Sequence, residues 1–206
     1  MKKRIYLFDF DKTLTDEDSI FLLWKYAFKK KKCHFLSFAM RMVRGSFKYI
    51  IHGFNFTMIK NEMVSVIGYF SDDELRAFVR YVYNEHILKD GVEFFNSIDN
   101  SSYKMLVSAS PINYLKYLDE FFDFDCIIGT ELNDDLTLSG KNNRSYEKVR
   151  RIRNHLREVN IEIDYDSSCA FSDSYKADRP MLEMVKNRYL INSDLKIDGY
   201  NNFHWI

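Results

Sequence analysis

The chain has 206 residues, 46% of them apolar and 29% charged, a balance that excludes a disordered or fibrous protein. Thirty basic residues offset thirty acidic ones, and this net charge of zero excludes a global attraction to nucleic acid. The length suits one domain, or one core that carries a sizeable insertion.

The first expected element is a buried parallel strand over residues 3–9 (KRIYLFD), which ends in carboxylates. Chemistry in open α/β sheets occurs at that edge of the strands. The run is too short for the apolar region of a signal peptide. No stretch reaches the roughly 18 uninterrupted apolar residues of a spanning helix, so we expect no integral membrane segment.

A helical insertion follows from about Asp18 to His86, where apolar residues recur at helical spacing without a convincing strand. Breaks near Gly45, Gly53 and Ser71 divide it into about four helices. Ser71 is the expected N-cap of the last one, with Glu74 three residues later as its capping-box partner.

Strands and helices alternate in the remainder. We expect strands at Tyr103–Val107, Cys126–Thr130, Cys169–Phe171 and Tyr189–Asn192. We expect helices at Ile112–Phe122, Ser145–Val159 and Arg179–Arg188, and a small hairpin or loop at Asp134–Lys141. This alternation predicts an α/β fold with a Rossmann-like three-layer core and a parallel sheet. The core takes residues 1–16 and 91–206, and an all-helical cap takes residues 17–90.

Asp9 and Asp11 follow the first strand, in the segment DFDKTLT. Two carboxylates this close at a strand end repel each other unless a cation, a shared proton or a phosphate partner compensates them. Magnesium prefers hard oxygen ligands and often bridges carboxylates to a substrate phosphate. The pair thus predicts a phosphoryl-transfer site, although the same short motif also occurs in solvated loops and helix caps.

DFDKTLT, a helical insertion, LVSASP, a lysine on a later helix and FSDSYKAD follow one another in the order typical of the haloacid dehalogenase superfamily. More narrowly, the chain resembles its phosphoserine-phosphatase-like branch, which carries a helical cap between the first two motifs. The resemblance covers almost the whole chain. It implies a magnesium-dependent phosphatase that acts through an aspartyl-phosphate intermediate.

By this resemblance, Asp9 is the nucleophile and a ligand of Mg²⁺. Asp11 is the general acid and base, binds the substrate phosphate and faces the metal with its main-chain carbonyl. Asp173 binds the metal directly, and Thr13 belongs to the tight turn after the strand. Lys12 stands where relatives often have Gly, a departure that we expect to affect the turn.

The resemblance also assigns the phosphate-binding groups. Ser108 is expected to bind a phosphate oxygen together with the main-chain N–H groups of Ala109 and Ser110. The same serine would also suit a helix N-cap. Lys148 neutralises charge on the phosphoryl group and the nucleophile, whereas Lys141 is expected to be a solvated surface charge.

Asp178 is expected to support the site through water or by orienting the lysine. Its alternative role is the N-cap of a helix that begins at Arg179. Ser172 occupies a place where relatives frequently have Gly, so the local turn is expected to differ.

The cap is expected to encode substrate choice, because in this superfamily it closes over the site. Asp18 matches a position where phosphoserine-specific relatives tend to place Glu, and the shorter side chain weakens that assignment. The candidate substrates are therefore phosphoserine, a sugar phosphate or a phospholipid head-group phosphate.

Lys29–Lys32 and the segment HFLSFAMRMVRGSFKYII place basic residues beside aromatic and apolar ones. Solvated lysines beside ordinary core helices are the favoured interpretation of such a pattern. The alternative is an interfacial helix that meets anionic lipid, which would imply peripheral membrane contact through the cap.

Other functions compete with hydrolysis. A phosphotransferase shares the fold, whereas a dehalogenase has no need of Asp11. A phosphate-responsive regulator or binding protein also uses clustered aspartates, but its compact pattern lacks the long insertion. Three widely spaced cysteines, Cys33, Cys126 and Cys169, suggest neither disulfides nor a zinc site. They suit the cytoplasm, with the inner membrane surface as the place of any lipid contact.

Overall fold

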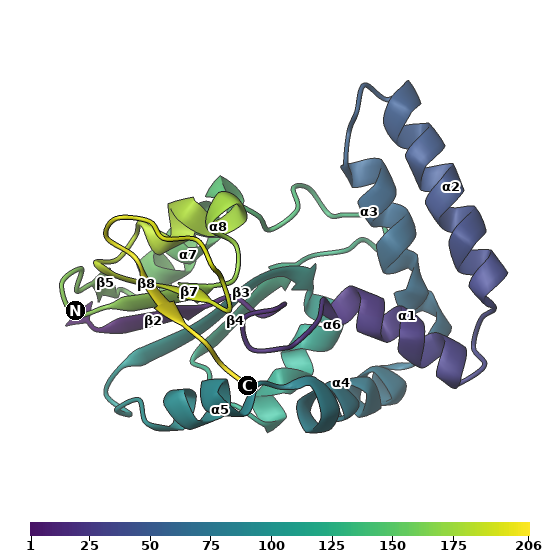
Figure 1. The fold of residues 1–206 in the computed structure, drawn as a ribbon. Helices are drawn as coiled ribbons and strands as arrows, with labels where there is room; N and C mark the ends of the chain where they lie inside the picture. The colour runs from purple at the N-terminus through teal and green to yellow at the C-terminus, as the bar shows by residue number, and fades with distance from the viewer.

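Six strands form the central sheet, and every neighbouring pair is parallel. The computed structural model describes all 206 residues, and Figure 1 shows the strands side by side. Their order is β4-β3-β2-β6-β7-β8, so the chain winds away from β2 in both directions. The strands are β2 (Ile5–Phe8), β3 (Tyr103–Pro111), β4 (Cys126–Thr130), β6 (Cys169–Ser172), β7 (Asn187–Ile191) and β8 (Asn201–Phe203). This change in the direction of winding opens a crevice at the carboxyl end of β2.

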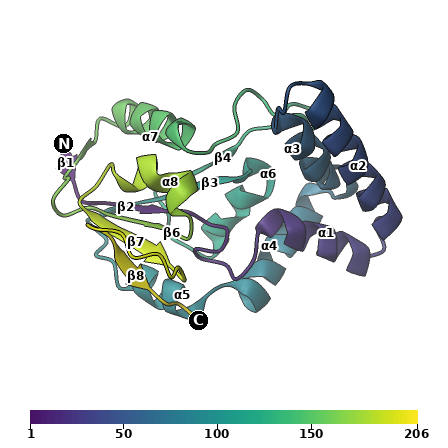
Figure 2. The ribbon, with the colours of Figure 1, turned by 45° about the horizontal axis from the view of Figure 1, so that its top comes forward.

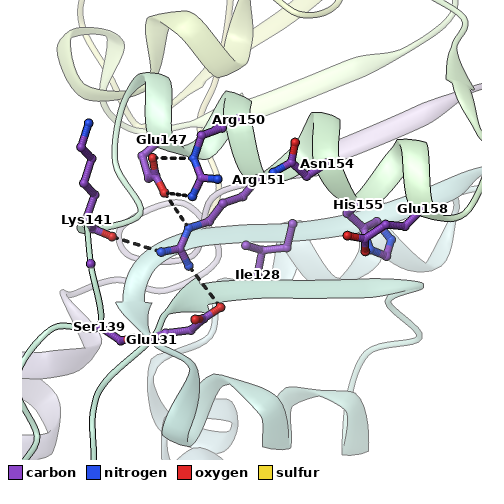
Figure 3. A pocket seen from close by; sticks show the side chains of 11 residues that line it. Ile128, Glu131, Ser139, Lys141, Glu147, Arg150, Arg151, Asn154, His155 and Glu158 are labelled. Atoms are coloured by element: carbon purple, nitrogen blue, oxygen red, sulfur yellow. Dashed lines mark hydrogen bonds and ion pairs between the residues drawn. The ribbon is translucent and has the colours of Figure 1, made fainter.

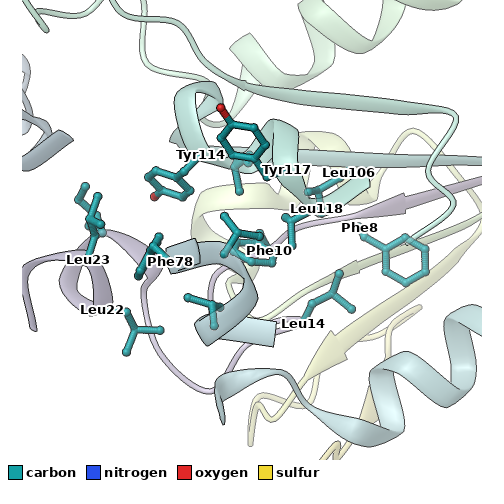
Figure 4. Packing of buried hydrophobic residues seen from close by; sticks show 14 of the residues in the cluster. Phe8, Phe10, Leu14, Leu22, Leu23, Phe78, Leu106, Tyr114, Tyr117 and Leu118 are labelled. Atoms are coloured by element: carbon teal, nitrogen blue, oxygen red, sulfur yellow. The ribbon is translucent and has the colours of Figure 1, made fainter. Parts of the chain in front are cut away.

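The side chains of β2 alternate between two apolar cores, one on each face of the sheet. Ile5 and Leu7 belong to one core, which also holds side chains of α7 and α8. Tyr6 and Phe8 belong to the larger core, part of which Figure 4 shows. Helices α7 (Tyr146–Glu158) and α8 (Tyr175–Leu182) pack into the first core, and α5 (Lys89–Asn96) packs into the larger one, which also takes side chains from several other helices. This arrangement confirms the expected three-layer α/β core.

The segment between β2 and β3 is helical, as the sequence predicts. It contains α1 (Ser19–Lys29), α2 (Phe35–Ile51), α3 (Thr57–Val64), the 3-10 helix η1 (Ser65–Tyr69) and α4 (Asp72–His86), followed by α5. Figures 1 and 2 show α2 and α3 standing beyond one end of the sheet, while α4 lies against α6 (Ile112–Leu115). None of these helices combines the length and apolar character required to cross a bilayer.

The expected break at Gly45 is wrong, because this glycine lies inside α2. A Cβ built on Gly45 would approach the Cγ of Glu62 to 3.2 Å and the Cα of Ile59 to 3.3 Å. Gly45 therefore serves the close approach of α2 to α3 rather than a turn.

The other two expected breaks are confirmed. Gly53 has a φ of +68°, in the left-handed region that ends the helix before it. Ser71 caps α4: its Oγ accepts the N–H of Glu74, and the Glu74 carboxylate accepts the N–H of Ser71. This capping box fixes the point where the chain re-enters helix after η1.

Several element boundaries differ from the expectation. The helix expected over 112–122 is α6 followed by the 3-10 helix η2 (Lys116–Glu120). The small hairpin or loop expected over 134–141 is confirmed as a loop closed by one isolated antiparallel bridge between Leu132 and Leu138. The short edge strand β8 has no apolar alternation (NNF) and is not predictable from pattern. A separate pair, β1 (Lys2–Lys3) and β5 (Glu162–Ile163), was not expected either.

Candidate active site

A cavity of about 200 Å³ lies where β2 and β6 end, at the strand-order reversal. Figure 2 shows this end of the sheet, with α8 on one side and α1 on the other. The lining of the cavity is almost entirely polar and comes from four separate parts of the chain. The lining residues are Asp9, Asp11, Asp18, Ala109, Arg144, Lys148, Asp173, Ser174, Ala177 and Asp178. The sequence-predicted aspartates thus face one shared space.

Asp9, Lys148 and Asp178 form a buried ion cluster in this cavity. The Nζ of Lys148 donates to Oδ1 of Asp9 at 2.8 Å and to Oδ2 of Asp178 at 2.7 Å. Burial opposes the charge of Lys148, but the two carboxylates raise its pKa. Burial also raises the pKa of the Asp9 carboxyl, against the effect of Lys148. The cluster is therefore short of positive charge, since one ammonium faces several carboxylates.

Ser172 holds Asp178 in place. Its Oγ donates to Oδ2 of Asp178 at 2.8 Å and accepts the N–H of Ser174 at 3.1 Å. A glycine at this position would supply no such hydroxyl. The departure from the family pattern at Ser172 thus adds a hydrogen bond to the carboxylate that orients the lysine.

Asp11 is held by the cap and by β3. The Ser19 N–H donates to its Oδ1 at 2.7 Å, and the Ser110 hydroxyl donates to its Oδ2 at 2.5 Å. Ser19 and Ser110 also hydrogen-bond each other through their hydroxyls, at 3.0 Å. The first residue of α1 and a residue of β3 thus fix the orientation of this carboxylate.

Thr13 joins the turn after β2 to the end of β6. Its Oγ1 accepts the N–H of Asp173 at 2.9 Å, and Thr13 is fully buried. This bond places the Asp173 carboxylate beside the segment that carries Asp9. Burial raises the pKa of Asp173 to about 6, and Asp178 adds to the effect. A buried carboxylate of this kind gains from a cation.

The donor set suits a hydrated magnesium ion better than a cation held by protein atoms alone. No three acidic, His or Cys side chains are close enough together to hold an ion by themselves. If Asp11 offers its main-chain carbonyl, as the resemblance implies, only Asp9 and Asp173 would supply carboxylates. Oδ1 of Asp178 is buried and meets no donor of the chain. Water bound to a magnesium ion would satisfy it, since magnesium usually keeps several waters.

Ser108 does not line the cavity, whereas its neighbour Ala109 does. The hydroxyl of Ser108 is buried and accepts the N–H of Ser110 at 3.0 Å. The alternative role of Ser108 as a helix cap is wrong, because β3 continues to Pro111 and α6 has no side-chain cap. In this structure Ser108 shapes the irregular end of β3, where the pairing with β4 shifts register.

The alternative role of Asp178 as an N-cap is also wrong. Helix α8 begins at Tyr175, and Ser174 caps it by accepting the N–H of Ala177 at 3.3 Å. Asp178 therefore lies in the first turn of the helix, where a carboxylate is favourable. From there its side chain reaches Lys148.

Lys60 and Arg144 were not foreseen from the sequence. Lys60, on α3, is buried without an ion-pair partner, and burial lowers its pKa while Asp11 and Asp18 oppose that effect. Arg144 lines the cavity. A single lysine on an amphipathic helix has no local signature, so only the fold reveals that Lys60 lies within the electrostatic reach of Asp11 and Asp18.

Asp18 lines the same cavity, at the entry to α1. Its Oδ2 pairs with the Nζ of Lys12 at 2.7 Å. This carboxylate is thus engaged by a lysine of the chain itself.

A wider hollow of about 560 Å³ lies beside α7 and β4, away from the aspartates (Figure 3). Its most central cation, Arg151, donates to the Glu147 carboxylate and to the main-chain oxygens of Gly129 and Lys141. Because these charges already satisfy one another, we assign no chemistry to this hollow.

Comparison with known proteins decides the family. The haloacid dehalogenase-like hydrolase family matches residues 6–183, which include every aspartate of the cavity. The chain belongs to this family. No match was found among curated proteins.

Solved structures share this hydrolase fold across nearly the whole chain. A protein of unknown function from Bordetella pertussis Tohama I has a TM-score of 0.79 at 18% identity, covering 98% of this chain and 99% of its own. A HAD family hydrolase from Salmonella enterica serovar Typhi has a TM-score of 0.67 at 14% identity, covering 98% of this chain and 68% of its own. A phosphoserine phosphatase, solved as a phospho-aspartyl intermediate analogue, has a TM-score of 0.61 at 16% identity, covering 94% of this chain and 88% of its own. These likenesses confirm the expected fold, a Rossmann-like core with a helical cap.

Proposed function

We propose that this hydrolase is a magnesium-dependent phosphatase that removes the phosphoryl group of a phosphomonoester through an aspartyl-phosphate on Asp9. The contact of Lys148 with Asp9 and Asp178 carries this proposal. It places a buried ammonium against the nucleophile, where a phosphoryl group brings further negative charge. The phospho-aspartyl analogue of the similar phosphoserine phosphatase supports the same reaction class.

In the first half-reaction, a carboxylate oxygen of Asp9 forms a bond to phosphorus. The bond from phosphorus to the leaving oxygen breaks, and Asp11 donates a proton to that oxygen. Asp11 now accepts hydrogen bonds from Ser19 and Ser110, so the leaving group has to replace one of them. Lys148 neutralises charge on Asp9 and on the phosphoryl oxygens, and the N–H of Ala109 contacts one of those oxygens.

In the second half-reaction, water attacks phosphorus and Asp11 takes its proton. The bond between phosphorus and the Asp9 oxygen breaks, which releases inorganic phosphate and restores the carboxylate. Asp9, Asp173 and the main-chain carbonyl of Asp11 would hold a magnesium ion, which would supply Lewis-acid polarisation of the phosphoryl oxygens. Asp178 and Thr13 hold Lys148 and Asp173 in position for both steps.

The helical segment 17–90 acts in this proposal as the cap over residues 1–16 and 91–206. Its contributions to the site are Ser19, which donates to Asp11, Asp18, which lines the cavity, and Lys60, whose charge Asp11 favours. Lys60 has no ion-pair partner of its own, and we assign it to an oxygen of the substrate on the leaving-group side. The substrate is a small or lipid-linked phosphomonoester. The free cysteines Cys33, Cys126 and Cys169 suit a cytoplasmic enzyme.

An assay with a generic aryl phosphate tests the proposal. We expect hydrolysis with magnesium, none with EDTA, and a loss of about a thousandfold or more in Asp9→Asn and Asp11→Asn. Lys141→Gln, a change of an exposed charge outside the cavity, is the matched control and should retain full activity. Activity that persists in EDTA, or in Asp9→Asn, would refute the mechanism.

A further inference from the structure

One long side of α2 carries large apolar side chains that no other part of the chain covers. They recur every three or four residues and end in an adjacent pair, so they form one continuous row on the helix. Each is between 58 and 70% exposed. We call them the α2 stripe: Leu36, Met40, Val43, Phe47, Ile50 and Ile51. Phe54, equally exposed, continues the row beyond the end of the helix.

The opposite side of α2 is firmly packed. Gly45 meets α3, and the ring of Phe38 lies 4.8 Å from that of Trp24 on α1. The buried carboxylate of Glu62 on α3 accepts a hydrogen bond from Lys48 at 2.8 Å. Figure 1 shows α2 at the outer edge of the molecule, with α3 between it and the sheet. The helix is thus held in place while the stripe remains uncovered, and exposed apolar rows of this size mark interaction sites.

The charge around the stripe is strongly one-sided, although the whole chain is neutral. Residues 19–61 contain nine basic residues and no Asp or Glu. Glu62, the first acid after them, pairs with Arg41, Arg44 and Lys48 together, so positive charge remains in excess. Lys30 and Lys31 add two exposed cations just before α2. An apolar row bordered by cations is the pattern of a helix that lies in the surface of an anionic bilayer.

We infer that the α2 stripe docks the protein on the surface of a bilayer that contains anionic phospholipid. The helix lies in the plane of the interface, with the stripe among the acyl chains and the basic residues at the head groups. At 17 residues it is about 25 Å long, enough to anchor one edge of the molecule without crossing the membrane.

A second copy of the chain fits the stripe less well. A symmetric dimer would set the same surface against itself, and two surfaces with excess positive charge repel each other. An anionic bilayer offers both an apolar layer and opposite charge. If the proposed hydrolysis holds, docking also brings the aspartate cavity to phosphomonoesters that lie in the membrane, and this consequence alone rests on the proposed function.

Flotation with vesicles tests the inference. The probes are vesicles of phosphatidylcholine alone and of phosphatidylcholine mixed with phosphatidylglycerol. We expect the full chain to float only with the anionic vesicles. Met40→Ser/Phe47→Ser should weaken this binding about a hundredfold, since two large apolar side chains no longer enter the bilayer. Lys30→Gln/Lys31→Gln should weaken it by about thirtyfold and reduce its dependence on salt.

Matched controls change exposed residues away from α2. Val159→Ser/Leu195→Ser removes two exposed apolar side chains, Lys141→Gln/Lys196→Gln removes two exposed charges, and both pairs should bind as the unchanged chain does. A Phe47→Trp variant gives a direct signal, because its fluorescence should shift to the blue when anionic vesicles are added.

The outcome is separable from that of the proposed hydrolysis. Asp9→Asn should float normally, and Met40→Ser/Phe47→Ser should hydrolyse a soluble aryl phosphate normally when no vesicles are present. Three results would overturn the inference: absence of flotation with anionic vesicles, equal flotation of the stripe variant, or stripe-dependent self-association without vesicle binding. The last would identify a second copy as the occupant.

Discussion

Lys12 has a backbone conformation that suits glycine, with a φ of +56° in the turn that follows Asp9. The resemblance leads us to expect Gly at this position, and Gly adopts this conformation without strain. Lys12 retains a compensating contact, its ion pair with Asp18, although both side chains are substantially exposed and the pair contributes little. The turn is thus strained at one residue beside the nucleophile.

We expect Lys12→Gly to be more stable than Lys12→Ala by about 1 kcal/mol. Both changes remove the ion pair with Asp18, but only glycine adopts the positive φ without strain. Urea unfolding of the two variants measures the difference. Equal stabilities, or a more stable alanine variant, would show that the turn does not impose the left-handed conformation.

Single residues also mark the limit of what the sequence reveals about the site. Asp9, Asp173 and Lys148 could be identified from the sequence because each belongs to a motif that follows a strand or begins a helix. These motifs follow one another along the chain in a known order. The roles of these residues remain predictions, but the fold places all three in one cavity. Lys60 belongs to no motif, and the motif LVSASP implies a role for the main-chain N–H of Ser110 but not for its hydroxyl. The electrostatic effect of Asp11 on Lys60 and the hydroxyl contact of Ser110 depend on how the cap and β3 approach Asp11, which no local pattern encodes.

Among the elements, helix α7 does more than carry Lys148. Its first turn also holds a cluster of ion pairs. Arg150 and Arg151 both donate to the Glu147 carboxylate, as Figure 3 shows. The bond from Arg150 is the main reason that the pKa of Glu147 falls to about 2. The helix that positions Lys148 is thus stabilised, next to that lysine, by an ionised Glu147.

The pH dependence of this contribution has a definite sign. The pKa of Glu147 is lower in the folded protein than in the unfolded chain, where it is about 4.3. Its stabilisation is therefore complete above about pH 4.3 and is lost as the pH falls toward about 2. We expect Glu147→Gln to lower the free energy of unfolding at neutral pH, and the difference from the unchanged chain to shrink in acid. Denaturant titrations at several pH values measure this difference in the free energy of unfolding. A difference that is constant with pH would contradict this account.

Element types were easier to foresee than element boundaries. The strand Cys126–Thr130 and the helix near 145–159 were predicted almost to the residue, because apolar runs and helical periodicity define them. Helix α8 begins earlier than expected, since Ser174 caps it and Pro180 lies inside its short length. The exposed row on α2 has the same periodicity as a buried face, so only the packing shows that nothing covers it.

For the whole molecule, the main electrostatic cost of the fold lies where the two halves of the sheet meet. Burial raises the pKa of Asp173 to about 6, above the value of about 3.9 in an unfolded chain. Without metal, stability therefore falls as the pH rises from about 3.9 to about 6, and the full cost is present above that. A divalent cation binds only the ionised form.

We accordingly expect magnesium to raise the melting temperature more above about pH 6 than below it. Asp173→Asn should abolish this increment, whereas Asp194→Asn, a change at an exposed carboxylate outside the cavity, should preserve it. Thermal unfolding with magnesium and with EDTA, across the pH range, gives the answer without any assay of activity. An increment that is equal at all pH values would mean that Asp173 does not hold the metal.

The most direct measurement of the central claim is the mass of the protein during turnover. The chain is mixed with magnesium and an aryl phosphate, quenched in acid, digested and analysed by mass spectrometry. We expect the peptide that contains Asp9 to carry the added mass of one phosphoryl group, and Asp9→Asn to carry none while its fold is unchanged. Turnover without any adduct, or an adduct on a residue other than Asp9, would contradict the account.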